Sequence, residues 1–185
     1  MGRDESSAAS FLEARLELAR LDVDDVSRLD RILEHATRIS AEQLEVERAG
    51  IWMFDSERTA LVECLVYNRS TRAHARPGTK IALASVPKYA AALEEMRALV
   101  FEDARSHPAT LPLLETYLDP LGIGSLLDTP VFRRGKLFGI VCHEHVGARR
   151  VRAEGVALAV EVPVVGVAEP GVHRAGMEAL PVPRI

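Results

Sequence analysis

The spacing of hydrophobic residues divides the chain into predicted helices and strands. From about residue 25, apolar positions recur at steps of three and four, which places them on one face of a helix. These positions are Val26, Leu29, Ile32, Leu33, Ala36 and Ile39. An earlier segment, SFLEARLELAR over 10–20, predicts another helix, with Ser10 as its cap. The stripe covers about two heptads, too few to indicate a coiled coil but enough for a short dimer seam.

Beyond residue 48 the pattern favours strands. RAGIWMFD and ALVECLVY, joined by a polar turn over 55–59, predict one hairpin. A second hairpin is predicted over 125–146, where two apolar segments flank the basic turn RRGK. Between the hairpins we expect a basic loop over 69–78, a short strand over 80–84, a helix from Pro87, a strand over 99–103 and a short helix between Pro108 and Pro120. This order predicts an α+β fold, an antiparallel sheet with long helices on one face and crossover segments on the other.

The character of the chain changes again after Arg150. The sequence becomes rich in Val, Ala and Gly, and a helix over 153–162 is predicted to stop at Pro163. We therefore expect an N-terminal helical arm over 1–24, one globular domain over 25–162 and a poorly anchored tail over 163–185.

Composition limits the classes of partner. The 185 residues, 48% hydrophobic and 27% charged, are typical of a globular domain, and the net charge of −4 argues against a nucleic-acid partner. No apolar segment approaches the length of a membrane span, and the N-terminus does not resemble a signal peptide, so we expect a cytoplasmic protein without a membrane partner. Cys64 and Cys142 lie far apart and form no C-x-x-C pair, so we expect both to stay reduced.

The most conspicuous chemical cluster is Cys142-His143-Glu144-His145, in the last predicted strand. Side chains alternate faces along a strand, so Cys142 and Glu144 share one face while His143 and His145 share the other. A metal ion held by the two histidines would need a third ligand from elsewhere, such as His74 or Asp103, and two His at strand spacing are a weak metal signal. We expect no metal and no cofactor.

Three parts of the sequence together resemble the GAF family of sensory domains. They are the helix leading into RAGIWMFD, the FEDA segment and LLDTPVFRRGKLFGIVCHEHVG, within a resemblance that runs from about Leu29 to Arg150. The amino-acid sequence looks most like those of GAF domains that precede bacterial histidine kinases or cyclic-dinucleotide enzymes. The resemblance implies an antiparallel sheet of five or six strands flanked by helices on both faces, small-molecule sensing in signal transduction such as a two-component system, and a homodimer formed through the N-terminal helices. The chain departs from the family pattern at Val151, where a Trp is usual, and at Pro163, which cuts the usual signalling helix.

We expect the ligand, an unidentified small molecule, to bind between the sheet and the middle helices, in a mostly apolar pocket with a few polar groups. The predicted lining residues are Trp52, Phe54, Tyr67, Tyr89, Leu93, Asp103, Ser125, Leu127, Thr129, Val141 and His143. The alternative is that these residues are simply core, and that the domain is a ligand-free dimerisation or interaction module. A redox enzyme of the GAF type is a third reading. It is disfavoured because both cysteines lie in predicted strands, where a buried thiol behaves as a small apolar group. The signatures of bilin-binding and cyclic-nucleotide-binding GAF domains are absent.

Overall fold

The computed structural model describes residue 13 and residues 29–95, 98–133 and 136–150. Apart from residue 13, the predicted helix over 10–20, the helix over 153–162 and the tail lie outside the described residues. The helical elements are α2 (Leu29–Gln43), the 3₁₀ turn η2 (Leu83–Ser85), α3 (Pro87–Leu93), the 3₁₀ turn η3 (Leu111–Leu113), the π-helical turn η4 (Leu114–Leu118) and α4 (Asp119–Leu121). The strands are β1 (Arg48–Phe54), β2 (Ala60–Asn68), β3 (Ala73–Ala75), β4 (Lys80–Ala82), β5 (Leu99–Phe101), β6 (Ile123–Arg133) and β7 (Lys136–Val146).

The strands form one antiparallel sheet in the order β3-β2-β1-β7-β6-β5, with β4 also paired to β2. Both predicted hairpins are confirmed, as β1–β2 and β6–β7. The two hairpins are joined through β1 and β7, which are far apart in sequence but pair along six residues of each strand. The predicted fold class is confirmed, with seven strands rather than five or six because the loop over 69–78 contains β3.

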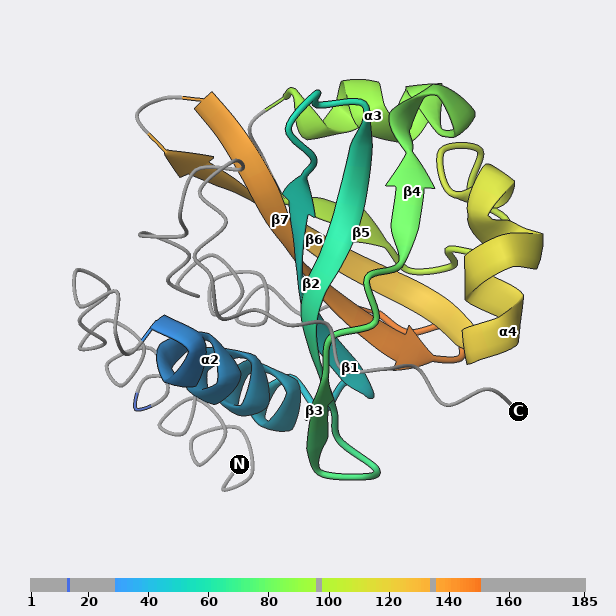
Figure 1. Ribbon diagram of the computed structural model, residues 1–185. Coiled ribbons are helices and arrows are strands. Elements are labelled where there is room, and N and C mark those ends of the chain that lie inside the picture. The colour runs from blue at the N-terminus through green and yellow to red at the C-terminus, as the bar shows by residue number, and fades with distance from the viewer. Residues whose placement is uncertain (1–12, 14–28, 96–97, 134–135, 151–185) are drawn as a thin grey trace, which may run out of the picture.

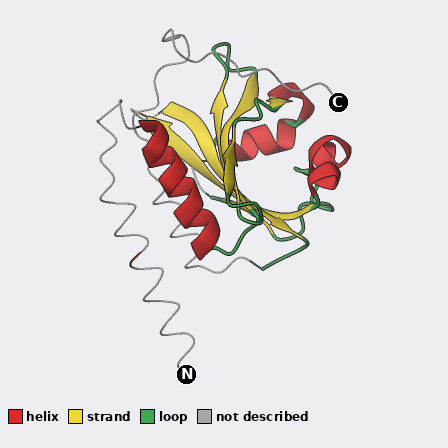
Figure 2. Cartoon of the chain, turned by 60° about the horizontal axis from the view of Figure 1, so that its bottom comes forward, coloured by secondary structure: helices red, strands yellow, loops and turns green. Residues whose placement is uncertain are grey.

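Helices cover both faces of the sheet, as Figure 2 shows edge-on: α2 lies on one side and the short helices lie on the other. Figure 1 places α3 and α4 away from α2. The buried apolar residues accordingly divide into two clusters. One contains Leu33, Ala36 and Ile39 of α2, and the other contains residues of α3, η3 and η4. The core is therefore two layers separated by the sheet. Among the described residues, none of the helices has the length and apolar content needed to span a bilayer.

The apolar stripe of α2 packs within the chain. Leu33, Ala36 and Ile39 belong to the cluster against the sheet, and Ile32 is also buried. These four positions therefore do not form an exposed seam for a second copy, and a dimer through the N-terminal helices would have to use other residues.

The middle helices are shorter and less regular than the sequence predicted. The helix from Pro87 ends at Leu93, and the predicted helix between Pro108 and Pro120 is a succession of 3₁₀, π and α turns. Pro112 and Pro120 each stand in the first turn of their element, because a proline has no N–H to donate to an earlier turn. Single π-helical turns are frequent at functional sites.

Candidate functional site

A small hollow of about 20 Å³ lies between the sheet and the short helices. Its wall is mostly apolar and aromatic, with the two carboxylates Asp128 and Glu144. The lining residues are Trp52, Leu61, Ile81, Tyr89, Leu113, Tyr117, Leu126, Asp128, Ile140, Cys142 and Glu144. A space of this volume holds about one water molecule. A larger open hollow of about 410 Å³ lies over Glu42 and Arg69, but the small one is where the buried polar groups of the sheet converge. A molecule larger than water would need the short helices to move.

A buried polar network borders this hollow, and strand irregularity brings it together. The register between β1 and β2 shifts between Ile51 and Trp52, so that Ile51 faces Leu65 while Trp52 faces Glu63. Cys64 is the extra residue of this bulge. A bulge reverses the alternation of side chains beyond it, which turns Glu63 to the side of the sheet that carries the hollow. Without the bulge, Glu63 would share the face of Leu65, against α2.

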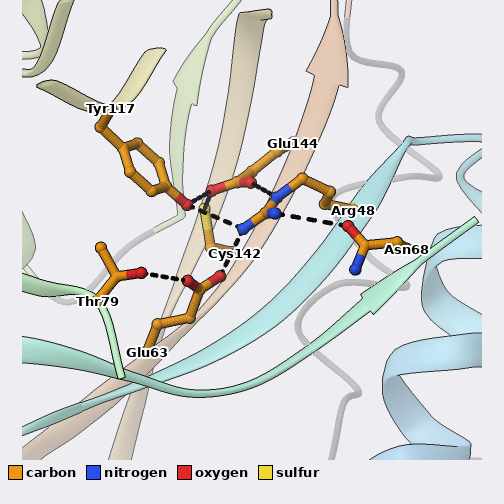
Figure 3. A network of polar contacts seen from close by, with 7 residues as sticks. All are labelled: Arg48, Glu63, Asn68, Thr79, Tyr117, Cys142 and Glu144. Carbon is orange, nitrogen blue, oxygen red and sulfur yellow. Dashed lines mark hydrogen bonds and ion pairs between the residues drawn. The ribbon is translucent and has the colours of Figure 1, made fainter. Parts of the chain in front are cut away.

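The network is centred on the guanidinium of Arg48, which Figure 3 shows between two carboxylates. Nη2 donates to Oε1 of Glu63 at 2.6 Å, and Nε donates to Oε2 of Glu144 at 2.5 Å. The Tyr117 hydroxyl donates to Oε1 of Glu144 at 2.5 Å, and the Thr79 hydroxyl donates to Oε2 of Glu63 at 3.0 Å. Every carboxylate oxygen of this network has a partner, as burial requires.

Burial and charge shift the pKa values of the network. Burial raises the pKa of Glu63 to about 7, although the Arg48 guanidinium acts in the opposite direction. Burial acts to lower the pKa of Arg48, but the neighbouring acidic groups, Glu144 first, raise it above its ordinary value. Burial, together with the Glu144 carboxylate, raises the pKa of the Tyr117 hydroxyl. Arg48 therefore stays charged, and Tyr117 stays a neutral hydrogen-bond donor.

A third carboxylate, Asp128, lies in the wall of the hollow without a charged partner among the described side chains. Its residue is 1% exposed, and Oδ2 accepts a hydrogen bond from the Tyr89 hydroxyl at 2.6 Å. The other oxygen, Oδ1, is buried and has no hydrogen-bond partner. Burial raises the pKa of Asp128 to about 7, while the Cys142 thiol and the Tyr89 hydroxyl act to lower it. Burial and the Asp128 carboxylate raise the pKa of the Cys142 thiol, so Cys142 stays protonated.

The opposite face of β7 carries His143, which packs against α2. Its Nδ1 donates to the carbonyl of Leu127 at 3.2 Å, so Nε2 accepts the short hydrogen bond from the Ser40 hydroxyl of α2. Burial lowers the pKa of His143 to about 4, which keeps the ring neutral. His143 thus joins α2 to the sheet.

The structure separates the eleven residues predicted to line one pocket. Trp52 and Tyr89 line the hollow, and Phe54 and Leu93 lie in the same cluster without lining it. Tyr67, Leu127 and Val141 belong instead to the cluster against α2.

The other four predicted residues also lie away from the hollow; they are Asp103, Ser125, Thr129 and His143. Thr129 pairs with Val141 and Ser125 pairs with His145, so both share the face of His143. Asp103 lies in an exposed turn, where it accepts hydrogen bonds from the Arg105 amide and the Ser106 hydroxyl. The residues predicted on β6 and β7 thus lie on the odd-numbered face of these strands, whereas the even-numbered face lines the hollow.

Sequence reasoning missed Arg48, Glu63, Tyr117 and Asp128 as site residues. Charged residues inside otherwise apolar strands are a usable signal, because burying them requires partners. The predicted separation of Cys142 and Glu144 from His143 is confirmed. Within the described part of the chain, no three His, Cys, Asp or Glu side chains are arranged to hold a metal ion.

Comparison with known proteins supports the fold. A family model described as GAF domain matches residues 28–162, well over half of the chain. The structure resembles the GAF domain of a phosphoenolpyruvate-protein phosphotransferase from Coxiella burnetii, with a TM-score of 0.64 at 18% identity over 83% of this chain and 88% of that one. It also resembles the GAF domain of PixJ from Thermosynechococcus elongatus in a blue-light absorbing form, with a TM-score of 0.62 at 19% identity over 75% and 83% of the two chains.

A third similar structure is an enzyme, the free methionine-R-sulfoxide reductase from Neisseria meningitidis in complex with its substrate. The TM-score is 0.57 at 14% identity, over 84% of this chain and 83% of that one. No curated protein matches the chain. At these identities the resemblances establish the fold and leave the ligand to be argued from the site.

Proposed function

The chain belongs to the GAF domain family, whose members are generally sensory modules. On this premise we propose that it is a sensory domain. It binds a small molecule in the hollow and transmits the bound state of the hollow to α2. The proposal places the ligand among residues of β1, β6, β7, α3 and η4. It excludes all five residues that the sequence predicted on β6 and β7.

The observation that carries the proposal is the alternation of side chains along β7. Cys142 and Glu144 line the hollow, while His143 between them is hydrogen-bonded to Ser40 of α2. A ligand that displaces this stretch of β7 therefore acts on α2 through one residue. Such a relay requires that the ligand bind more tightly to one arrangement of α2 than to the other.

The small size of the hollow favours one alternative, a ligand-free interaction module. Side chains fill most of the space, leaving about 20 Å³. Opening this wall at η4 would break the hydrogen bond from the Tyr117 hydroxyl to Glu144.

The redox enzyme reading has less support from the thiols. Burial raises the pKa of both Cys64 and Cys142, which keeps them as unreactive thiols. We propose that the domain is not an enzyme. Measurable sulfoxide reduction by the wild-type protein that Cys142→Ser abolishes would overturn this proposal.

A thermal-shift screen against a broad metabolite library tests the ligand. A compound that binds the folded state raises the melting temperature in proportion to its concentration relative to Kd. Hydrogen exchange with the best compound then tests the relay. We expect altered protection in residues 29–43 in wild type, and a smaller change in Ser40→Ala. If no compound shifts the melting temperature, the sensory proposal fails and the interaction module stands.

Two earlier expectations remain predictions, a cytoplasmic location and a homodimer through the N-terminal helices. Light scattering at micromolar concentration tests the dimer. A strictly monomeric protein would contradict it.

A further inference from the structure

The unpaired oxygen of Asp128 is the feature of the hollow that calls for a ligand. A buried carboxylate oxygen without a hydrogen bond loses its hydration and gains nothing in return, so native structures rarely leave one. Oδ1 of Asp128 has no partner in a residue that is 1% exposed. The nearby thiol of Cys142 has a single weak donor, which lies 3.4 Å from Oε1 of Glu144 and also acts to lower the pKa of Asp128, so it cannot satisfy both carboxylates.

The charge around the hollow is also unbalanced. Arg48 already forms ion pairs with both Glu63 and Glu144. Within the described residues, no Lys, Arg or His forms an ion pair with Asp128. The single guanidinium thus pairs with two of the three carboxylates, and a positive charge beside Asp128 would balance the third.

The remaining wall suits a cation better than an anion. Three aromatic side chains line the same hollow, namely Trp52, Tyr89 and Tyr117. The rings of Trp52 and Tyr117 are packed edge to face, with 5.5 Å between their centroids. Aromatic faces attract ammonium groups through their quadrupoles, most strongly where water is excluded. An anion would meet two carboxylates of the wall, Asp128 and Glu144, at close range.

We propose that the hollow binds the ammonium head of a small organic amine, with Oδ1 of Asp128 as its acceptor. This inference rests on the proposed function, for which it names the class of ligand. The volume of about 20 Å³ fits one ammonium nitrogen, which is close to a water molecule in size. A primary ammonium therefore binds better than a quaternary one, whose methyl groups would need η4 to move further.

Binding is coupled to protonation. The titratable and charged groups around Asp128 are Tyr89 of α3, Cys142 and Glu144 of β7, Tyr117 of η4, and Arg48 and Glu63 behind Glu144. The pKa of Asp128 is raised to about 7, and a cation at Oδ1 favours its ionised form. Amine binding therefore releases a proton near neutral pH, and the affinity rises between pH 6 and pH 8.

The test uses the full chain and methylammonium chloride as the probe, with potassium chloride at equal ionic strength as the salt control. Tetramethylammonium, methanol and acetate serve as the bulky cation, the neutral molecule and the anion. We expect methylammonium to raise the melting temperature above the potassium control and above the other three probes. Calorimetry in two buffers of different ionisation enthalpy should show proton release on binding.

Asp128→Asn keeps the shape of the side chain and removes its charge. It should weaken methylammonium binding at least about tenfold, because a charge-assisted hydrogen bond is lost. Asp103→Asn, in an exposed turn, is the matched control and should bind as wild type does. The proton release of the wild-type protein tests the proposal even if Asp128→Asn does not fold.

Three outcomes would overturn the proposal of a cationic ligand. They are a melting temperature in methylammonium no higher than in potassium, no proton release on binding, or an unchanged affinity for methylammonium in Asp128→Asn. If a neutral or anionic metabolite binds and Asp128→Asn leaves its affinity intact, only the ligand class fails. If neither the amines nor the metabolite library shifts the melting temperature, the ligand class and the sensory proposal fail together.

Discussion

The two faces of the sheet differ in how they bury polar groups. On the α2 face, His143 is neutral, and both of its ring nitrogens have partners in Ser40 and Leu127. On the face of the short helices, Arg48 is shared between two carboxylates while Asp128 keeps one oxygen unpaired. The face of the short helices therefore buries charged groups around a small hollow, whereas His143 on the α2 face is neutral and fully paired.

Because its side chains alternate, the single strand β7 contributes residues to both faces of the sheet. β7 contributes His143 to the α2 face and Cys142 and Glu144 to the hollow face. Among the described residues, Thr129 Oγ1 and His145 Nδ1 on the face of His143 are also buried without a partner, so what distinguishes the hollow face is that its unpaired atom is a carboxylate oxygen. A binding function is expected where a buried carboxylate lacks a partner. Four predictions test this comparison, from the largest expected effect to the smallest.

The largest effect is expected from Arg48→Met. The substitution leaves Glu63 and Glu144 buried without their cation, and losing one partner of a buried ion pair reduces the free energy of unfolding by about 3–5 kcal/mol. Urea unfolding at pH 8 measures it. Arg38→Met, which removes an exposed pair with Glu42, is the control and should change it by about 0.5 kcal/mol or less. A loss of under about 1 kcal/mol for Arg48→Met would show that the hollow face does not need its charge paired.

On the α2 face, Ser40→Ala tests the neutral pair. It leaves Nε2 of His143 buried without a donor, so we expect a loss of about 1–3 kcal/mol in the free energy of unfolding. The matched control is Ser106→Ala, at an exposed hydrogen bond to Asp103, with a change within about 0.5 kcal/mol. Equal effects of the two variants would contradict the tight contact between α2 and β7.

The pH dependence of stability should have opposite signs for the two faces. Glu63 and Asp128 have folded pKa values of about 7, above their ordinary values of 4.5 and 3.8, so their stabilising contribution is full at low pH and is lost as pH rises through 7. His143 has a folded pKa of about 4, below 6.5, so its contribution is present above pH 6.5 and is lost as pH falls through 4.

Two variants separate these contributions. Between pH 5 and pH 7, Asp128→Asn should flatten the fall of stability with rising pH, and His143→Gln should steepen it. Each change is up to about 1.4 kcal/mol per pH unit. Urea unfolding of wild type and both variants across this range measures the slopes. A change of slope in the same direction for both variants would refute the assignment of opposite signs.

The smallest effect concerns the two thiols. Cys142, in the hollow, is 5% exposed, whereas Cys64 is half-buried and packs on the α2 side. We expect Ellman's reagent to label Cys64 slowly and Cys142 more slowly still, as measured in Cys64→Ser and Cys142→Ser. Faster labelling of Cys142 would mean that the hollow opens readily to solvent.

Several features follow from local sequence and were predictable. The apolar segments around the RRGK turn and over 48–67 specify two hairpins, because turn residues and β-branched residues act over short range. The GAF family, the fold class and the separation of Cys142 from His143 required only motif text and the alternation of a strand. The apolar stripe of α2 was also visible, although its partner, the sheet, was not.

Tertiary structure decided which face of β6 and β7 borders the hollow. The alternation of side chains along a strand shows which residues share a face. The helices that pack on that face are decided by the pairing of β1 with β7, in which Gly50 lies opposite Cys142. The bulge at Cys64 then places Glu63 beside Arg48, against strict alternation. By itself, the sequence determined the family, the strands and the residues that share a face. Contacts between residues some ninety positions apart decided the site, because the energy of a buried charge depends on partners that only the folded chain brings together.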